Sequence, residues 1–247
     1  MRPAPVGRQV GVAPAVVLVA HGSRDPRAAA ATSALARSVR IARPDWDVHA
    51  AYLDHAGPRP LDVLAALGRR RAVLVPLLLT AAYHGRVDMP AVLADARALP
   101  VRVSLAEVLG PVSSLLLDGL VRRLGDPGLD AVVLAAAGTR DAAARATVAE
   151  AADALGARLS VPSGVGYASA ASPTVGDAVA ALRARGARRV AVASYFLAPG
   201  RLYDVAVESA LSAGAVAVAP PLTDAPELVR LVQERVAAVE AAQLIAA

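Results

Sequence analysis

The segment AVVLVAHGSRD, residues 15–25, decides the fold because it occurs a second time as AVVLAAAGTRD, residues 131–141. The two copies are separated by a constant offset of 116 residues. A second pair of segments follows the same plan: GRRRAVLVPLLLTAAYHGR at 68–86 corresponds to GARRVAVASYFLAPGR at 186–201, which is three residues shorter. Internal similarity at a fixed spacing indicates a duplicated structural unit.

Each half alternates short apolar runs with helix-length segments. The runs are rich in Val and Leu, as strands covered on both faces must be, and the alternation predicts parallel sheets with right-handed crossovers. We therefore expect an α/β fold with two similar doubly wound domains, residues 1–125 and 126–247, joined near GDPGLD at 125–130 and facing each other across a cleft. In the first half we expect strands near 15–20, 48–53, 72–79 and 101–105, and helices near 26–42, 60–69, 88–98 and 112–124.

Two helix starts are visible in the sequence. Asp25 is a good N-cap residue, and Pro26 suits the first position of a helix. A similar signal, TDAPEL at 223–228, opens the last helix.

Composition excludes several classes of protein. Of the 247 residues, 56% are hydrophobic and 19% are charged, so the chain has enough apolar material for a large core. The absence of Cys excludes disulfides, thiolate metal sites and cysteine nucleophiles. No apolar run reaches the roughly 18 residues of a membrane span, and the N-terminus is too short in its apolar part for a signal peptide. We expect a cytoplasmic protein with no membrane partner.

The net charge of +5 is unevenly distributed. Residues 1–125 hold 16 Arg and 9 acidic residues, whereas residues 126–247 hold 10 Arg and 12 acidic residues. A basic first half favours an anionic ligand there. Arg is not interleaved with aromatic residues and no nucleic-acid-binding motif occurs, so we expect no nucleic acid partner.

Potential metal ligands follow three of the expected strands. His21 follows the first strand, Asp54 and His55 follow the second, and His84 comes just past the third. In a sheet of order 2-1-3-4 these strand ends converge at the crevice where ligands bind. His49, at the start of the second strand, lies at the opposite edge. Imidazole and carboxylate together suit Fe, Co, Ni or Zn, so we predict a metal site with His21, His84 and Asp54 as ligands. Asp54 could alternatively only cap the following turn.

The second half retains the scaffold without these imidazoles. At the offset of 116, His21 becomes Ala137, and on the alignment of the two Gly-Arg pairs His84 becomes Pro199. Histidines with a purely structural part would be expected to persist with the scaffold. The loss of both imidazoles from the second half fits a fused pseudo-dimer that keeps one active centre.

With HGSRDP at 21–26 and PLLLTAAYHGRVDMP at 76–90, the sequence resembles the sirohydrochlorin chelatases of the CbiX/SirB type, which are class II chelatases. The resemblance covers nearly the whole chain and implies the two-domain, chelatase-like long form. It implies that His21 and His84 bind the metal and assist its insertion. It also implies that Asp54 stands where the family has a glutamate, whose side chain is one methylene longer. The implied metals are Fe2+ for siroheme and Co2+ for cobalamin, with Ni2+ less expected. No nucleotide is implied, and no GxxxxGK[ST] motif occurs.

The resemblance also implies an anionic substrate, sirohydrochlorin, which carries eight carboxylates. The residues that we expect to hold it are Ser23, Arg24, Arg86, Arg140 and Arg201. Ser23 could equally only satisfy loop amides, and Arg86 could be a solvated surface charge. We expect the chain to act as a monomer that is an internal pseudo-dimer.

Two other classes of function remain open. One is a metal-binding or tetrapyrrole-carrying module without catalysis. The other is a histidine phosphatase, which has Arg-His-Gly after its first strand, but here Ala20 stands in the place of that Arg. A serine hydrolase is weaker still, because GxSxG does not occur.

Overall fold

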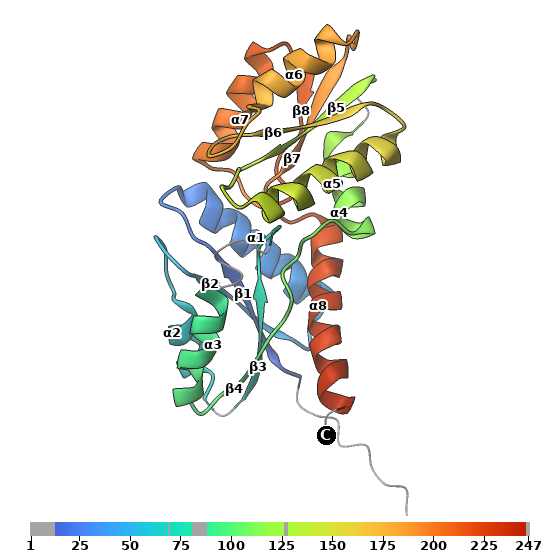
Figure 1. The fold of residues 1–247 in the computed structure, drawn as a ribbon. Coiled ribbons are helices and arrows are strands. Elements are labelled where there is room, and N and C mark those ends of the chain that lie inside the picture. Colours follow the sequence, from blue (N-terminus) through green and yellow to red (C-terminus); the bar gives the residue numbers. More distant parts are fainter. Residues whose placement is uncertain (1–12, 69, 81–87, 126–127, 246–247) are drawn as a thin grey trace, which may run out of the picture.

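The chain forms two four-stranded parallel sheets, one from each half of the sequence (Figure 1). The computed structural model describes residues 13–68, 70–80, 88–125 and 128–245. The strand orders are β2-β1-β3-β4 and β6-β5-β7-β8, so the strand order reverses between β1 and β3 in one sheet and between β5 and β7 in the other. The expected fold class and the expected 2-1-3-4 order of the first sheet are confirmed.

The elements follow the alternation read from the sequence. The first half contains β1 (Ala15–Ala20), α1 (Pro26–Ala42), β2 (Asp47–Tyr52), α2 (Pro60–Ala66), β3 (Arg71–Pro76), α3 (Met89–Asp95), the short 3-10 helix η2 (Ala96–Ala98), β4 (Arg102–Leu105) and α4 (Ser114–Leu124). The second half contains β5 (Ala131–Ala136), α5 (Ala142–Leu159), β6 (Ser163–Tyr167), α6 (Val175–Ala184), β7 (Val190–Tyr195), α7 (Arg201–Ser212), β8 (Ala217–Val218) and α8 (Pro226–Ile245).

Two predicted elements end three residues early: α2, expected to reach residue 69, ends at Ala66, and β3 is the other. We expected this strand to continue to residue 79, but it ends at Pro76. Leu77 still donates to the carbonyl of Val19, whereas the amide of Leu78 bonds back to Pro76, at 2.9 Å, so the chain leaves the sheet there. The predicted helix starts are confirmed: Asp25 accepts from the amide of Arg27 at the start of α1, and α8 begins at Pro226.

The last helix of each half packs on the sheet of the other half. After β4 the chain crosses to the second sheet, where α4 packs against β7 and α5, and α8 returns to pack against β3 and α1 (Figure 1). Arg235 of α8 donates to the carbonyl of Val108 at 2.8 Å. The predicted domain boundary at residue 125 stays a prediction. It divides the two copies of the repeat, but α4 and α8 each pack on the half to which they do not belong in sequence.

The exchange joins the two halves through one continuous core. Alternate residues of β1, among them Val16 and Leu18, share this core with α1, α8, α4 and α5. The other face of the first sheet is covered by α2 and α3, and the other face of the second sheet by α6 and α7. Both sheets are therefore covered on both faces, as their continuous apolar strands require. In the parts of the chain that the structure describes, no helix combines the length and the apolar character needed to cross a membrane.

The exchanged helices meet at a buried carboxylate. Glu227, in the first turn of α8, is 8% exposed and accepts from the Nε of Arg122 of α4 at 3.0 and 3.1 Å. We expect Glu227→Gln to lower the free energy of unfolding by about 1–2 kcal/mol, because a charge-assisted hydrogen bond is replaced by a neutral one. The cost stays modest because the Arg122 side chain is 44% exposed and can rehydrate. Urea unfolding of the two proteins measures this difference, and an unchanged midpoint would contradict it.

Candidate active site between the two halves

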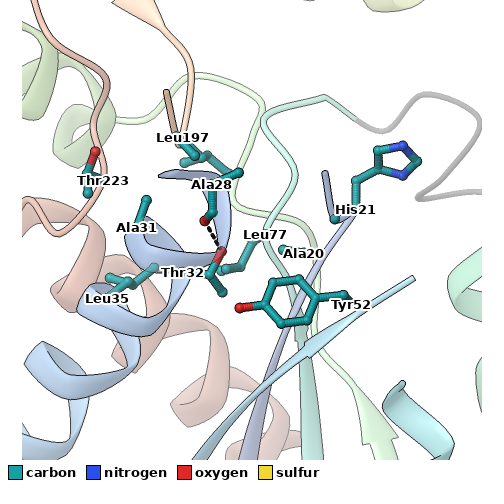
Figure 2. A pocket seen from close by; sticks show the side chains of 12 residues that line it. Ala20, His21, Ala28, Ala31, Thr32, Leu35, Tyr52, Leu77, Leu197 and Thr223 are labelled. Atoms are coloured by element: carbon teal, nitrogen blue, oxygen red, sulfur yellow. Dashed lines mark hydrogen bonds between the residues drawn. The ribbon is translucent and has the colours of Figure 1, made fainter. Parts of the chain in front are cut away.

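An apolar cavity of about 170 Å³ lies at the carboxyl end of β1, where the two halves meet (Figure 2). Its floor comes from α1 and the strand ends of the first half. Leu197, Ala198 and Thr223 close it from the second half. Figure 2 shows His21 at one end of the cavity, directly after β1, and the hydroxyl of Tyr52 turned toward α1. The expected crevice at the strand ends is thus present and has walls from both halves.

The loop of His21 is fastened to the loop after β2. The amide of Asp54 donates to the carbonyl of His21 at 2.8 Å, and the amide of Leu53 donates to Ala20 at 3.0 Å. Gly22 makes this approach possible: its φ is +94°, and a Cβ placed there would lie 1.8 Å from the carbonyl oxygen of Asp54. The backbone therefore brings the side chains that follow β1 and β2 to one place.

Asp54 lies at the predicted place, with its carboxylate turned toward its own loop. Oδ1 accepts from the amide of His55 at 2.8 Å, and Oδ2 lies 3.5 Å from Nε2 of His55. The amide of His55, together with the charges of His55 and Arg59, holds the pKa of Asp54 below its usual value. The carboxylate is therefore ionised at neutral pH, as a metal ligand must be.

The sequence places His55 in the loop after β2 but does not predict how its ring is oriented. Its ring lies edge-on to that of His21, with ring centroids 6.2 Å apart and an interplanar angle of 85°. The His55 backbone has φ +58°, and the side chain is 37% exposed. The sequence predicts a metal ligand in the loop after β2. Only the structure shows that the ring of His55 lies next to that of His21.

The predicted three-ligand metal site is only partly within the described residues. His84 and Arg86 lie outside them, so their predicted roles stay predictions. Among the residues that the structure does describe, no three His, Asp or Glu side chains converge closely enough to hold a metal ion. His21 and Asp54 are brought together by their backbones, and His49 lies apart from them at the start of β2, 2.8 Å from Asp47.

The candidate substrate-binding residues are placed at the carboxyl ends of their sheets. Ser23 accepts from the amide of Asp25 at 3.0 Å, and Thr139 does the same for Asp141 in the second half, at 3.2 Å. The Ser23 hydroxyl thus has a structural part in the loop. Three exposed arginines lie after strand ends and form no ion pair within the described part of the chain: Arg24, Arg140 and Arg201.

Two side-chain contacts join the halves beside this cavity. Arg27 of α1 lies 2.6 Å from a carboxylate oxygen of Asp204 of α7, and both side chains are half-exposed. The hydroxyl of the buried Tyr195, at the end of β7, donates to the carbonyl of Leu79 at 3.2 Å. Burial raises the pKa of Tyr195, so the hydroxyl remains protonated and can donate.

Comparison with known proteins identifies the family of this chain. The sequence model of the CbiX family matches residues 15–126 and, a second time, residues 131–239. The chain belongs to the CbiX family. Each CbiX match contains one of the two sheets, so the duplication seen in the sequence is a duplication of the family's own unit. A comparison with curated proteins gives no match.

Solved structures of similar proteins share the fold. SirB from Bacillus subtilis with Fe3+ is 20% identical, with a TM-score of 0.76 over 90% of this chain and 93% of that one. SirB of Bacillus subtilis subspecies spizizenii, described as a sirohydrochlorin chelatase in complex with cobalt, is also 20% identical, with a TM-score of 0.70 over the same shares of the two chains. CbiX, described as the terminal enzyme of siroheme biosynthesis in denitrifying bacteria, is 21% identical, with a TM-score of 0.65 over 91% of this chain and 98% of that one.

Proposed function

We propose that this CbiX-family chain is a sirohydrochlorin chelatase, a lyase that inserts Fe2+ or Co2+ into the tetrapyrrole sirohydrochlorin. The observation that carries the proposal is the position of His21. His21, which the resemblance marks as a metal ligand, stands at the carboxyl end of β1, beside an apolar cavity whose walls come from both CbiX units. An open site of imidazole and carboxylate suits a metal that must be given up, whereas a closed site would retain it.

The residues divide into two groups by their chemistry. His21, His84 and Asp54 present the metal, and Asp54 contributes a carboxylate that is already ionised. Ser23, Arg24, Arg86, Arg140 and Arg201 hold carboxylates of the substrate. The apolar side chains at the cavity, such as Leu77 and Leu197, offer a surface against which the flat macrocycle packs.

Insertion exchanges two protons for one metal ion. The metal forms bonds to the ring nitrogens while two pyrrole N–H bonds break, and the two protons leave the macrocycle. A neutral imidazole of His21 or His84 accepts one of these protons as a general base, and the other passes to water. The metal meanwhile exchanges its protein ligands for ring nitrogens and keeps its oxidation state.

The deciding experiment is an anaerobic assay with purified full-length chain, sirohydrochlorin and either Fe2+ or Co2+. Metal insertion changes the absorption spectrum of the macrocycle, so its rate is followed directly. We expect a rate well above that of spontaneous insertion with at least one of the two metals. Binding of both substrates without acceleration would instead identify a carrier module and overturn the proposed activity.

The arginines give a separate expected outcome. Raising the ionic strength should raise KM for sirohydrochlorin, because exposed charge pairs are screened over about 8–10 Å at ordinary salt concentrations. Arg140→Ala should raise this KM by up to about fivefold with little change in kcat, the effect of an exposed ion pair. Arg185→Ala is the matched control, since Arg185 is equally exposed but ends α6. A KM that does not respond to salt would show that apolar packing alone holds the macrocycle.

The proposal includes the compartment and the oligomeric state of the enzyme. We place it in the cytoplasm, acting as a monomer whose two units, residues 1–125 and 126–247, form an internal pseudo-dimer. Within it the second unit forms a wall of the cleft, because Ala137 and Pro199 cannot coordinate a metal.

A further inference from the structure

We propose that His55 is a metal ligand of this chain and forms with His21 a two-imidazole site that receives the divalent transition-metal cation at the rim of the cleft. The inference rests on the proposed function in one respect: the ion received is that function's substrate. The binding itself needs no tetrapyrrole and can be measured alone.

The turn after β2 holds the His55 side chain in place. The amide of Ala56 bonds to the carbonyl of Asp54 at 2.7 Å, which closes a three-residue turn with His55 at its centre. His55 has φ +58°, a conformation that costs a residue with a side chain about 1–3 kcal/mol. Because Asp54 is also bonded to the carbonyl of His21, the strained residue is fixed next to that histidine.

The matching loop of the second half repeats the positive φ of His55 without the imidazole. Ser169 donates to the carbonyl of Ala137 at 3.0 Å, as Asp54 does to His21, and Ala170 has φ +56° where His55 has +58°. The backbone strain is therefore a property of the duplicated loop, and alanine adopts this conformation in the same protein. The turn gives no reason for an imidazole at position 55. Its presence beside His21, in the half that carries the candidate site, points to coordination chemistry.

The geometry suits two nitrogen donors for one ion. The rings of His21 and His55 lie edge-to-face with centroids 6.2 Å apart, and both side chains reach solvent. Metal–imidazole bonds are about 2.0–2.1 Å long, so two rings at this separation can reach a common ion after small rotations. Imidazole selects Fe2+, Co2+, Ni2+ or Zn2+ over Mg2+ and Ca2+, which prefer oxygen. These two donors leave further positions for the other proposed ligands, for water and then for ring nitrogens.

The test is Co2+ binding to the full-length chain in the absence of tetrapyrrole, measured by anaerobic titration of the visible cobalt absorption. We expect His55→Ala to raise Kd for Co2+ by at least about tenfold, since even residues that only support a ligand alter metal affinity 10- to 100-fold. The cobalt spectrum at saturation should also change, because one nitrogen donor is replaced by water. Millimolar Mg2+ should not compete with Co2+.

The controls separate a lost ligand from a lost fold. His49→Ala removes an imidazole from β2, the strand that precedes the His55 loop, and should leave Kd for Co2+ unchanged. His55→Ala should melt like the wild type, because Ala170 already adopts the matching positive φ. A Kd and a cobalt spectrum both unchanged in His55→Ala would overturn the inference, even if the wild type inserts metal efficiently. Co2+ binding that depends on His55, in a chain that does not accelerate insertion, would support the inference and overturn the proposed function.

Discussion

His21→Ala is expected to lower the rate of metal insertion at least about 100-fold, the lower end of the contribution of a general acid or base. His84→Ala should have a similar effect. Because one histidine cannot present the metal or accept the proton without the other, the double variant should be little slower than either single variant. Initial rates with saturating metal and sirohydrochlorin measure all three.

His49→Ala serves as the matched control for these variants, because His49 lies at the opposite end of β2 from the cavity. It should retain nearly full activity. Insertion at a near-normal rate by the His21→Ala, His84→Ala double variant would show that the chemistry occurs at another place. Effects of the single variants that multiply in the double variant would show that the two histidines act independently.

Gly22→Ala is the substitution with the largest expected effect on the scaffold of the site. Its Cβ would lie 1.8 Å from the carbonyl oxygen of Asp54, so the loops after β1 and β2 must separate. Alanine at φ +94° adds backbone strain of about 1–3 kcal/mol. We expect a loss of at least about 2 kcal/mol in the free energy of unfolding and a loss of more than tenfold in metal insertion, because His21 and Asp54 no longer lie side by side.

The repeat supplies the control for this prediction. Gly138 has the same φ of +94°, and its Cβ would meet the carbonyl oxygen of Ser169 at the same 1.8 Å. Gly138→Ala should therefore cost a similar free energy of unfolding, measured in urea, while insertion assayed below the melting temperature stays near the wild-type rate. An equal loss of activity in both variants would mean that global stability, and not the His21 loop, limits the reaction.

The sequence predicted the sheets well because their order follows from local patterns. Continuous apolar strands alternating with helices allow few arrangements, and the repeat requires the second sheet to match the first. The exchange of α4 and α8 was not predictable in this way. The apolar face of a helix such as α4 packs equally well on either of two similar sheets, and its own sequence does not say which one.

The sequence predicted which strand ends carry the candidate site, but not how the side chains in the turns are oriented. His21 directly follows β1 and Asp54 is the second residue after β2, so the topology alone brings them together. The orientation of His55 depends on a positive φ in a three-residue turn, and the sequence Asp-His-Ala contains no glycine to announce it. Position 170, which has the matching positive φ in the second half, is alanine and gives no such signal either.

The exchange of the last helices has a consequence for how the protein is made. At about 5–20 residues per second, α8 leaves the ribosome several seconds after the first sheet is complete. During this interval the first sheet lacks α8, which in the finished protein packs against β3 and α1. The half with the candidate catalytic histidines is thus the first to be synthesised and the last to be closed. A premature stop before Pro226 would disable it, although α8 contributes no residue to the cavity.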